Sequence, residues 1–395
     1  MKTPIKSHRR TRVVRTLSAF VFLLICSNHP EAFSGTPSVN ETKEISSTTE
    51  KKKIKIALLL DTSNSMDGLI EQAKSQLWKF VNALSGATFQ GEKPILEIAL
   101  YEYGNDGLPS SEGYIRQVSI FTSDLDLISE KLFSLSTNGG NEFCGQVIQT
   151  SLNQLDWKGD ASDLRIIFIA GNEPFTQGKI SSSFACGNAK EKDVFVNTIH
   201  CGSFDQGIAQ GWQQGASLTG GNYMSIEQDR QTVYIASPYD DEISTLNDQL
   251  NKTYISYGAK GDYKKENQIR QDNNASGYGK ANKADRAISK TSSFYSNAEW
   301  DLVDASKEKS FDISTIKEEE LPAELKGKTI EERRIYVVKK TNEREIIKKK
   351  IVELNSTRIV FISQIQKNQP GNNSLDDAML KAITVQASKK GFVFK

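Results

Sequence analysis

The sequence predicts an α/β protein with a Rossmann-like, doubly wound and mostly parallel sheet over residues 54–228, followed by a mainly helical C-terminal region over 229–395. Short, nearly continuous apolar runs recur in the first part, as expected for strands that are buried on both faces. Amphipathic segments with helical spacing separate these runs, and this alternation is typical of parallel strands joined by right-handed crossovers. The chain has 395 residues, of which 37% are hydrophobic and 25% charged. This composition suits a full α/β domain plus a second region.

The N-terminal segment has the pattern of an export signal. Six basic residues precede or border the apolar run Leu17–Cys26, which is too short to span a bilayer, and small residues precede Gly35. We therefore expect a secretory signal peptide over 1–34 and a periplasmic or secreted protein with no stable membrane span. An uncleaved N-terminal anchor is the alternative. Residues 35–53 are rich in Ser, Thr, Glu and Lys, which predicts a flexible linker.

The elements of the sheet domain follow from local periodicity. The run Ile54–Leu60 predicts a central strand, and the apolar spacing in Leu69–Leu84 predicts the helix after it. Ligands of such sheets bind at the carboxyl ends of the strands. Further strands are predicted at Ile95–Tyr101, Arg165–Ala170, Val194–Ile199 and Tyr223–Ile226, and further helices at Leu125–Phe133, Cys144–Leu155 and Ile208–Leu218.

Beyond residue 228 the composition changes. Tyr254–Asn297 is rich in Asn, Lys, Gly and Ser, Thr329–Gln366 is rich in Lys, Glu and Arg, and a helix-start pattern precedes Ala378–Ala387. Residues 54–228 carry 11 basic and 20 acidic side chains, whereas 229–395 carry 29 and 25. This contrast leaves two alternatives open: docking between the two halves, or two separately solvated surfaces, to which most single charges belong. The C-terminal region is also a candidate stalk or self-association element. The near-neutral total charge gives no reason to expect nucleic acid as a partner.

One motif carries the candidate chemistry. The sequence Asp61-Thr62-Ser63-Asn64-Ser65 comes directly after the first predicted strand and opens the first predicted helix. Its D-x-S-x-S spacing places a carboxylate and two hydroxyls on one tight turn. These are hard oxygen donors, which suit Mg²⁺ or a similar divalent cation. The alternative is an ordinary helix N-cap that uses Ser63 or Ser65.

The strand–motif–helix unit resembles the metal-ion-dependent adhesion site (MIDAS) of a von Willebrand factor type A (VWFA) domain of an exported bacterial type. Later landmarks fit this resemblance over Ile54–Gln228: Asn138–Glu142 before a helix, Ile167–Pro174 at the end of a strand, and Ile199–Gly202 near the end of the domain. The resemblance implies a Rossmann-like fold and a non-enzymatic protein-binding or adhesion module. It also implies Mg²⁺, or Mn²⁺ or Ca²⁺, whose coordination is completed by an acidic side chain from a protein partner.

The chain departs from the family pattern at two positions. Asn141 and Glu142 stand where the second family motif has a threonine, with Thr137 slightly earlier, and Gly171 stands where the third motif has an aspartate. Either Glu142 or Glu173 could restore the second carboxylate. We predict Asp61, Ser63, Ser65 and Glu142 as the metal ligands. The alternative is a degenerate, metal-free VWFA site in a structural subunit of an envelope complex.

Other chemistry has little support. His200 is the only histidine after signal removal, so no histidine cluster can bind zinc, and a Ser-His-Asp or Cys-His system would have to use His200 alone. A metal-dependent hydrolase would need a positioned base that the sequence does not supply. Cys144, Cys186 and Cys201 form either one disulfide, of undetermined pairing, or three buried small side chains.

Overall fold

The structure is a computed structural model that describes residues 51–227, 234–366 and 375–394. The predicted signal peptide over 1–34 and most of the predicted linker lie outside the described residues, as does the predicted boundary at residue 228. None of the helices in the described ranges combines the length and apolar character that a bilayer span requires.

The core of the fold is a six-stranded sheet with the order β4-β3-β1-β5-β6-β7. β4 (Ile115–Thr122) lies at one edge and runs antiparallel to its neighbour, and the other pairs are all parallel. This arrangement confirms the predicted doubly wound, mostly parallel sheet. The parallel strands are β1 (Lys53–Asp61), β3 (Ile95–Tyr103), β5 (Leu164–Gly171), β6 (Phe195–Cys201) and β7 (Tyr223–Ile226).

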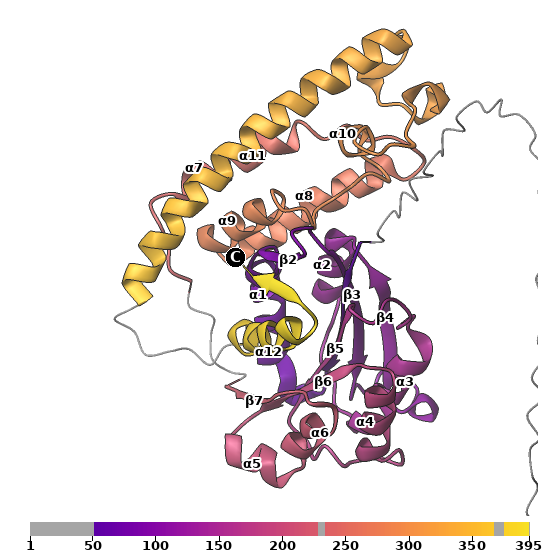
Figure 1. Cartoon of the computed structure of the whole chain (residues 1–395), viewed down its shortest axis with the longest axis vertical. Helices are drawn as coiled ribbons and strands as arrows, with labels where there is room; N and C mark the ends of the chain where they lie inside the picture. Colours follow the sequence, from indigo (N-terminus) through magenta and orange to yellow (C-terminus); the bar gives the residue numbers. More distant parts are fainter. Residues whose placement is uncertain (1–50, 228–233, 367–374, 395) are drawn as a thin grey trace, which may run out of the picture. The chain divides into compact units, whose positions relative to one another are not determined.

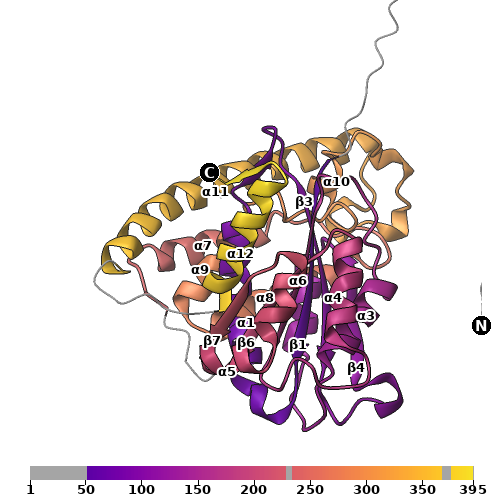
Figure 2. The ribbon, with the colours of Figure 1, turned by 60° about the horizontal axis from the view of Figure 1, so that its bottom comes forward.

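Helices cover both faces of this sheet. Successive strand side chains point to opposite faces, so Leu58 of β1 belongs to one hydrophobic core and Leu59 to another. Figure 2 shows the sheet between the helices of the two faces. The first face is covered by α1 (Asp67–Leu84) and α2 (Leu125–Phe133), and the second by α3 (Cys144–Gln154), α4 (Ser182–Glu191) and α6 (Trp212–Thr219).

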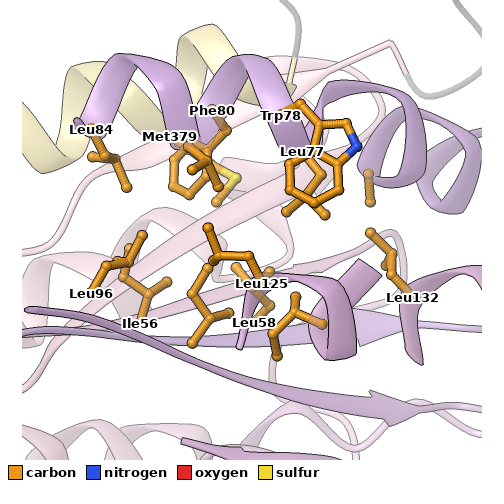
Figure 3. Close-up of a cluster of buried hydrophobic side chains, with 14 of the residues drawn as sticks. Ile56, Leu58, Leu77, Trp78, Phe80, Leu84, Leu96, Leu125, Leu132 and Met379 are labelled. Carbon is orange, nitrogen blue, oxygen red and sulfur yellow. The ribbon is translucent and has the colours of Figure 1, made fainter. Parts of the chain in front are cut away.

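The C-terminal helix α12 (Leu375–Lys389) also packs against the first face. Figure 3 shows its Met379 among side chains of α1, including Leu77 and Phe80, above strand residues such as Leu58. After α12, the short strand β8 (Phe392–Phe394) pairs antiparallel with β2 (Ala87–Phe89). Both α12 and β8 therefore contribute side chains to the core of the sheet domain.

The region between β7 and α12 is helical, as predicted (Figure 1). Its longest helix contains 37 residues and matches the predicted charged segment closely. Contacts link this region to the sheet domain mainly through α1 and α2. The helices are α7 (Asp240–Asn251), α8 (Gly261–Gly277), α9 (Lys280–Ser289), α10 (Leu302–Ala305) and α11 (Ile330–Gln366).

A buried cation holds the two regions together. The Arg286 side chain on α9 is fully buried and forms ion pairs of 2.7 Å with Asp126 on α2 and 2.8 Å with Asp272 on α8. Its guanidinium also lies 4.3 Å from the ring centre of Trp78 on α1. Docking between the halves, one of the two alternatives left by the sequence, is therefore present in the described part of the chain.

Several elements differ from the sequence-based expectations. The edge strand β4 and the helix α4 were not predicted. The single helix expected over Ile208–Leu218 is instead two helices, α5 (Phe204–Ala209) and α6, because the chain turns at Gly211 with φ +90°. A left-handed residue of this kind interrupts a right-handed helix.

Candidate metal centre

The D-x-S-x-S turn lies at the carboxyl end of β1, a central strand flanked by β3 and β5. Asp61 is the last residue of β1 and is fully buried. Its Oδ1 accepts a hydrogen bond of 2.7 Å from the backbone N–H of Ser63. This bond bends the chain into the short 3₁₀ turn Asn64–Met66, which leads into α1. The turn thus fixes the carboxyl group at the end of the sheet.

Glu142 lies beside Asp61, although 81 positions separate them in the sequence. It ends the loop that precedes α3, and only 3% of its surface is exposed. A Cβ atom placed on Gly104 would lie 2.7 Å from Asp61 Oδ1 and 2.8 Å from Glu142 Cγ, so both side chains occupy the space that this glycine leaves open. The two carboxyl groups share a hydrogen bond, and the Ser63 hydroxyl bonds to both.

The second hydroxyl completes a cluster of oxygen atoms. Ser65 Oγ lies 3.3 Å from Ser63 Oγ and accepts a hydrogen bond of 3.0 Å from Asn172 Nδ2. Ser65 is exposed, whereas the other three side chains are buried, so the cluster opens to solvent on the Ser65 side. The structure therefore brings together all four residues predicted as metal ligands.

The paired carboxyl groups are poorly stabilised as anions. Burial raises the pKa of Asp61 well above its usual range, and the adjacent Glu142 raises it further. Burial also raises the pKa of Glu142. In addition, Asp61 Oδ2 is buried without a hydrogen-bond partner. Two neighbouring buried carboxyl groups cannot both ionise at low cost unless a cation lies between or beside them.

These residues fit a divalent cation. Carboxylate and hydroxyl oxygens are the donors that Mg²⁺ prefers, and an oxygen without a partner is available to bind it. Within the described ranges, no three Asp, Glu, His or Cys side chains gather into a metal site, so the predicted centre depends on its serine hydroxyls. The N-cap alternative finds no support at Ser63, whose side chain makes no capping hydrogen bond.

The structure also explains the departures from the family pattern. The Thr137 hydroxyl donates to Asp67, away from Asp61. Gly171 has no room for a side chain, because its Cβ would lie 2.5 Å from the Tyr103 hydroxyl and 3.2 Å from Asp61 Oδ2. Of the two glutamates considered from the sequence, Glu142 approaches Asp61, whereas the Glu173 side chain is exposed.

Several contacts that support the site were not predicted. The backbone N–H of Glu173 donates to Glu142 Oε2 at 3.3 Å, and the backbone N–H of Glu142 donates to Gln177 Oε1 at 3.1 Å. The Tyr103 hydroxyl donates to the backbone carbonyl of Ala170 at 2.9 Å and so joins β3 to β5 below the site. Tyr103 ends β3 and Glu173 closely follows β5, and this position at the strand ends was their only signal in the sequence; Gln177, farther along the loop, had none.

The remaining reactive residues are buried away from solvent. Cys144, Cys186 and Cys201 are buried and form no disulfide with one another, so of the two alternatives the buried small side chains are confirmed. Burial raises the pKa of Cys144, which disfavours a thiolate. His200 is buried against Trp212, with ring centres 5.7 Å apart, and burial lowers its pKa.

Comparison with known proteins finds similarity only among solved structures. No family model and no curated protein matches the chain. BatB from Bacteroides thetaiotaomicron is 15% identical, over 44% of this chain and 90% of BatB, with a TM-score of 0.33. The SpRpn10 VWA domain is 17% identical, over 45% of this chain and 90% of that domain, with a TM-score of 0.34.

A third similar structure is proximal thread matrix protein 1 from the mussel byssus, with a zinc-occupied MIDAS motif. It is 11% identical, over 46% of this chain and 43% of that protein, with a TM-score of 0.33. VWA domains, the family that the sequence resembles, are thus among the solved structures to which this chain is similar. The fold assignment itself rests on the strand order and register.

Proposed function

We propose that this chain is a non-enzymatic, divalent-metal-dependent protein-binding module that is exported to the cell envelope. The observation that carries the proposal is the buried pair Asp61 and Glu142, which lies beside the hydroxyls of Ser63 and Ser65 and includes a carboxylate oxygen without a partner. Such a pair is costly to a fold unless it binds something. A divalent ion is the ligand that best balances its charge.

Each residue has a distinct part in this proposal. Asp61 and Glu142 supply the negative charge, and the two serines supply neutral oxygen atoms. Mg²⁺ suits this set, with Mn²⁺ or Ca²⁺ as alternatives, and when bound it supplies open coordination positions for an oxygen atom from outside. The exposed Ser65 marks the side from which a partner reaches the site. The family resemblance implies an acidic side chain as that partner group.

A binding role fits this site better than catalysis does. General acid–base catalysis needs a group that can reach a bound substrate. His200 and the cysteines described above are buried, and the carboxyl groups of Asp61 and Glu142 bond to each other. The proposal therefore assigns recognition, and not turnover, to the centre.

Removal of the metal tests the proposal. We expect the immobilised chain to capture envelope proteins in the presence of Mg²⁺ and to lose them in chelator, while its circular dichroism spectrum stays unchanged. Asp61→Ala should lose the same proteins at any Mg²⁺ concentration. Unchanged capture in chelator would contradict metal-dependent binding.

A second candidate function is a structural subunit with a metal-free site. The observation that favours it is the missing family ligands: Gly171 has no room for a carboxylate, and Thr137 bonds to Asp67 instead. Under this alternative, Asp61→Ala assembles and functions normally. Loss of assembly in that variant would select the metal-dependent module.

A further inference from the structure

The end of the sheet that carries the candidate metal centre is strongly acidic. The parallel strands all end there, and so do the loops that lead into the next elements. In the described part of these loops and the residues next to them, Lys179 is the only basic residue apart from Arg116 of β4, which is already paired with Glu102. The acidic residues are Asp61, Asp67, Asp106, Glu112, Glu142, Glu173, Asp205 and Glu227.

Three of these acidic side chains surround the opening of the site. Asp67 begins α1, directly after the D-x-S-x-S turn. The Asp106 backbone N–H donates to the carbonyl of Gly139 at 2.5 Å, which places Asp106 in the loop beside Asn64. Glu173 follows β5 and donates its backbone N–H to Glu142. All three side chains are exposed, so an approaching partner meets their charge.

The charge balance differs from that of a site with a single carboxylate. Asp61 and Glu142 together carry the charge that a divalent ion neutralises, so the loaded centre has no excess positive charge to attract an anion. The exposed carboxylates around it then set the sign of the local potential. Like charges brought together at an interface are repelled, and opposite charges speed association and select partners.

We propose that the partner of this site presents a basic surface and reaches the metal through a neutral oxygen atom, such as an amide or hydroxyl oxygen. This inference rests on the proposed metal-dependent function and replaces the acidic partner group implied by the family resemblance. The buried Asp61 oxygen without a partner is an atom that would bind the ion, and the acidic rim formed by Asp67, Asp106 and Glu173 would favour a partner of opposite charge.

Peptide binding tests the inference. Two nine-residue fluorescent peptides serve as probes: one has a central asparagine with lysine-rich flanks, and the other has a central aspartate with glutamate-rich flanks. Anisotropy is measured with the chain from Gly35 onward in Mg²⁺ at low salt. We expect the basic peptide to bind at least about tenfold tighter, with an affinity that falls as salt rises.

Charge reversal distinguishes the effect of the acidic side chains around the site from the effect of the overall negative charge. The double variant Asp106→Lys/Glu173→Lys, which leaves the four candidate ligands intact, should weaken binding of the basic peptide about tenfold. The control Glu242→Lys/Glu324→Lys reverses two exposed acidic residues in the helical region and should change binding less than twofold. An equal effect of both variants would show nonspecific attraction and would overturn the inference.

Calorimetric titration of Mg²⁺ into the same samples distinguishes a failure of the basic-partner inference from a failure of the proposed metal-dependent function. If Mg²⁺ binds but the acidic peptide binds as tightly as the basic one or tighter, the basic-partner inference is wrong and the metal site survives. If Mg²⁺ does not bind at all, the proposed function itself is wrong.

Discussion

At the scale of single residues, the two carboxyl groups of the candidate site lower the stability of the metal-free fold at neutral pH. Asp61 and Glu142 are both buried, and burial raises the pKa of each carboxyl group. A carboxyl group whose pKa is higher in the folded state destabilises the fold as the pH rises from its unfolded pKa through its folded pKa. These two carboxyl groups therefore destabilise the metal-free protein at neutral pH, and the destabilisation disappears in acid, where both are protonated.

Glu142→Gln tests this destabilisation. The amide removes one of the two competing charges, so we expect the metal-free variant to be more stable at pH 7 by about 1–3 kcal/mol, the usual cost of a poorly satisfied buried polar group. The gain should disappear near pH 4, where Glu142 is protonated in the folded wild type. Urea unfolding at both pH values measures the difference.

Two results would count against this reading of Glu142. One is a loss of metal-free stability at pH 7 in Glu142→Gln, and the other is a gain that is independent of pH. Glu242→Gln, at an exposed position on α7, serves as the control and should leave stability unchanged at both pH values.

Gly104→Ala tests how closely the site is packed. Gly104 has φ +79°, and an added Cβ would press on Asp61 and Glu142, whereas Gly91 has φ +87° with nothing within 4 Å. Both substitutions should cost about 1–2 kcal/mol for the left-handed backbone. Only Gly104→Ala should also weaken Mg²⁺ binding, as measured by calorimetry. Equal effects of the two variants on metal binding would contradict the geometry.

At the scale of elements, helices and strands could be predicted from the sequence where their buried residues form a hydrophobic pattern. The helix predicted at Leu125–Phe133 has the same bounds in the structure, because Leu125, Ile128 and Leu132 recur at helical spacing on its buried face. α8 gave no such pattern, since it buries polar side chains, among them Asn267, Gln268 and Gln271. Its buried face is satisfied by hydrogen bonds, such as the one of 2.8 Å from Ser129 Oγ to Gln271 Oε1.

The strength of the local sequence pattern also explains why β4 was missed and why only part of the site was visible in the sequence. β4 is an edge strand with few buried positions, so its alternation is weak. The D-x-S-x-S turn was visible because its residues are local in sequence. The approach of Glu142 to Asp61 and the blocked position at Gly171 depend on residues far apart in the sequence, so no local pattern encodes them, and Glu142 was predicted only through the family resemblance.

α12 should contribute to the stability of the sheet domain. Ile383 on this helix is fully buried in the core shared with α1, whereas Val385 is 50% exposed. We expect Ile383→Ala to destabilise the protein by about 2–5 kcal/mol, the usual cost of such a core truncation. Val385→Ala should cost less than about 0.5 kcal/mol. Similar small effects of both changes in urea unfolding would mean that α12 does not pack as described.

At the scale of the whole chain, Arg286 couples the helical region to the sheet domain. Its partners Asp126 and Asp272 belong to different regions, and all three side chains are buried. Arg286→Ala leaves two buried carboxylates without this cation and should cost about 3–5 kcal/mol. Lys280→Ala, which removes an exposed pair with Asp241, should cost less than about 1 kcal/mol.

The same variant tests cooperativity between the two regions. The wild type should unfold in one transition when followed by tryptophan fluorescence and by circular dichroism. Arg286→Ala should separate the two signals, since the helical region then loses a central contact with α1 and α2. Coincident transitions with unchanged stability would contradict the coupling.

The central claim is that Asp61, Ser63, Ser65 and Glu142 together bind a divalent cation. Isothermal calorimetry of Mg²⁺ and Mn²⁺ into the chain from Gly35 onward, repeated with Asp61→Ala and Glu142→Ala, tests it most directly. We predict one ion bound per chain in the wild type and loss of that binding in both variants. Absence of heat in the wild type, or the same binding in the two variants, would contradict the claim.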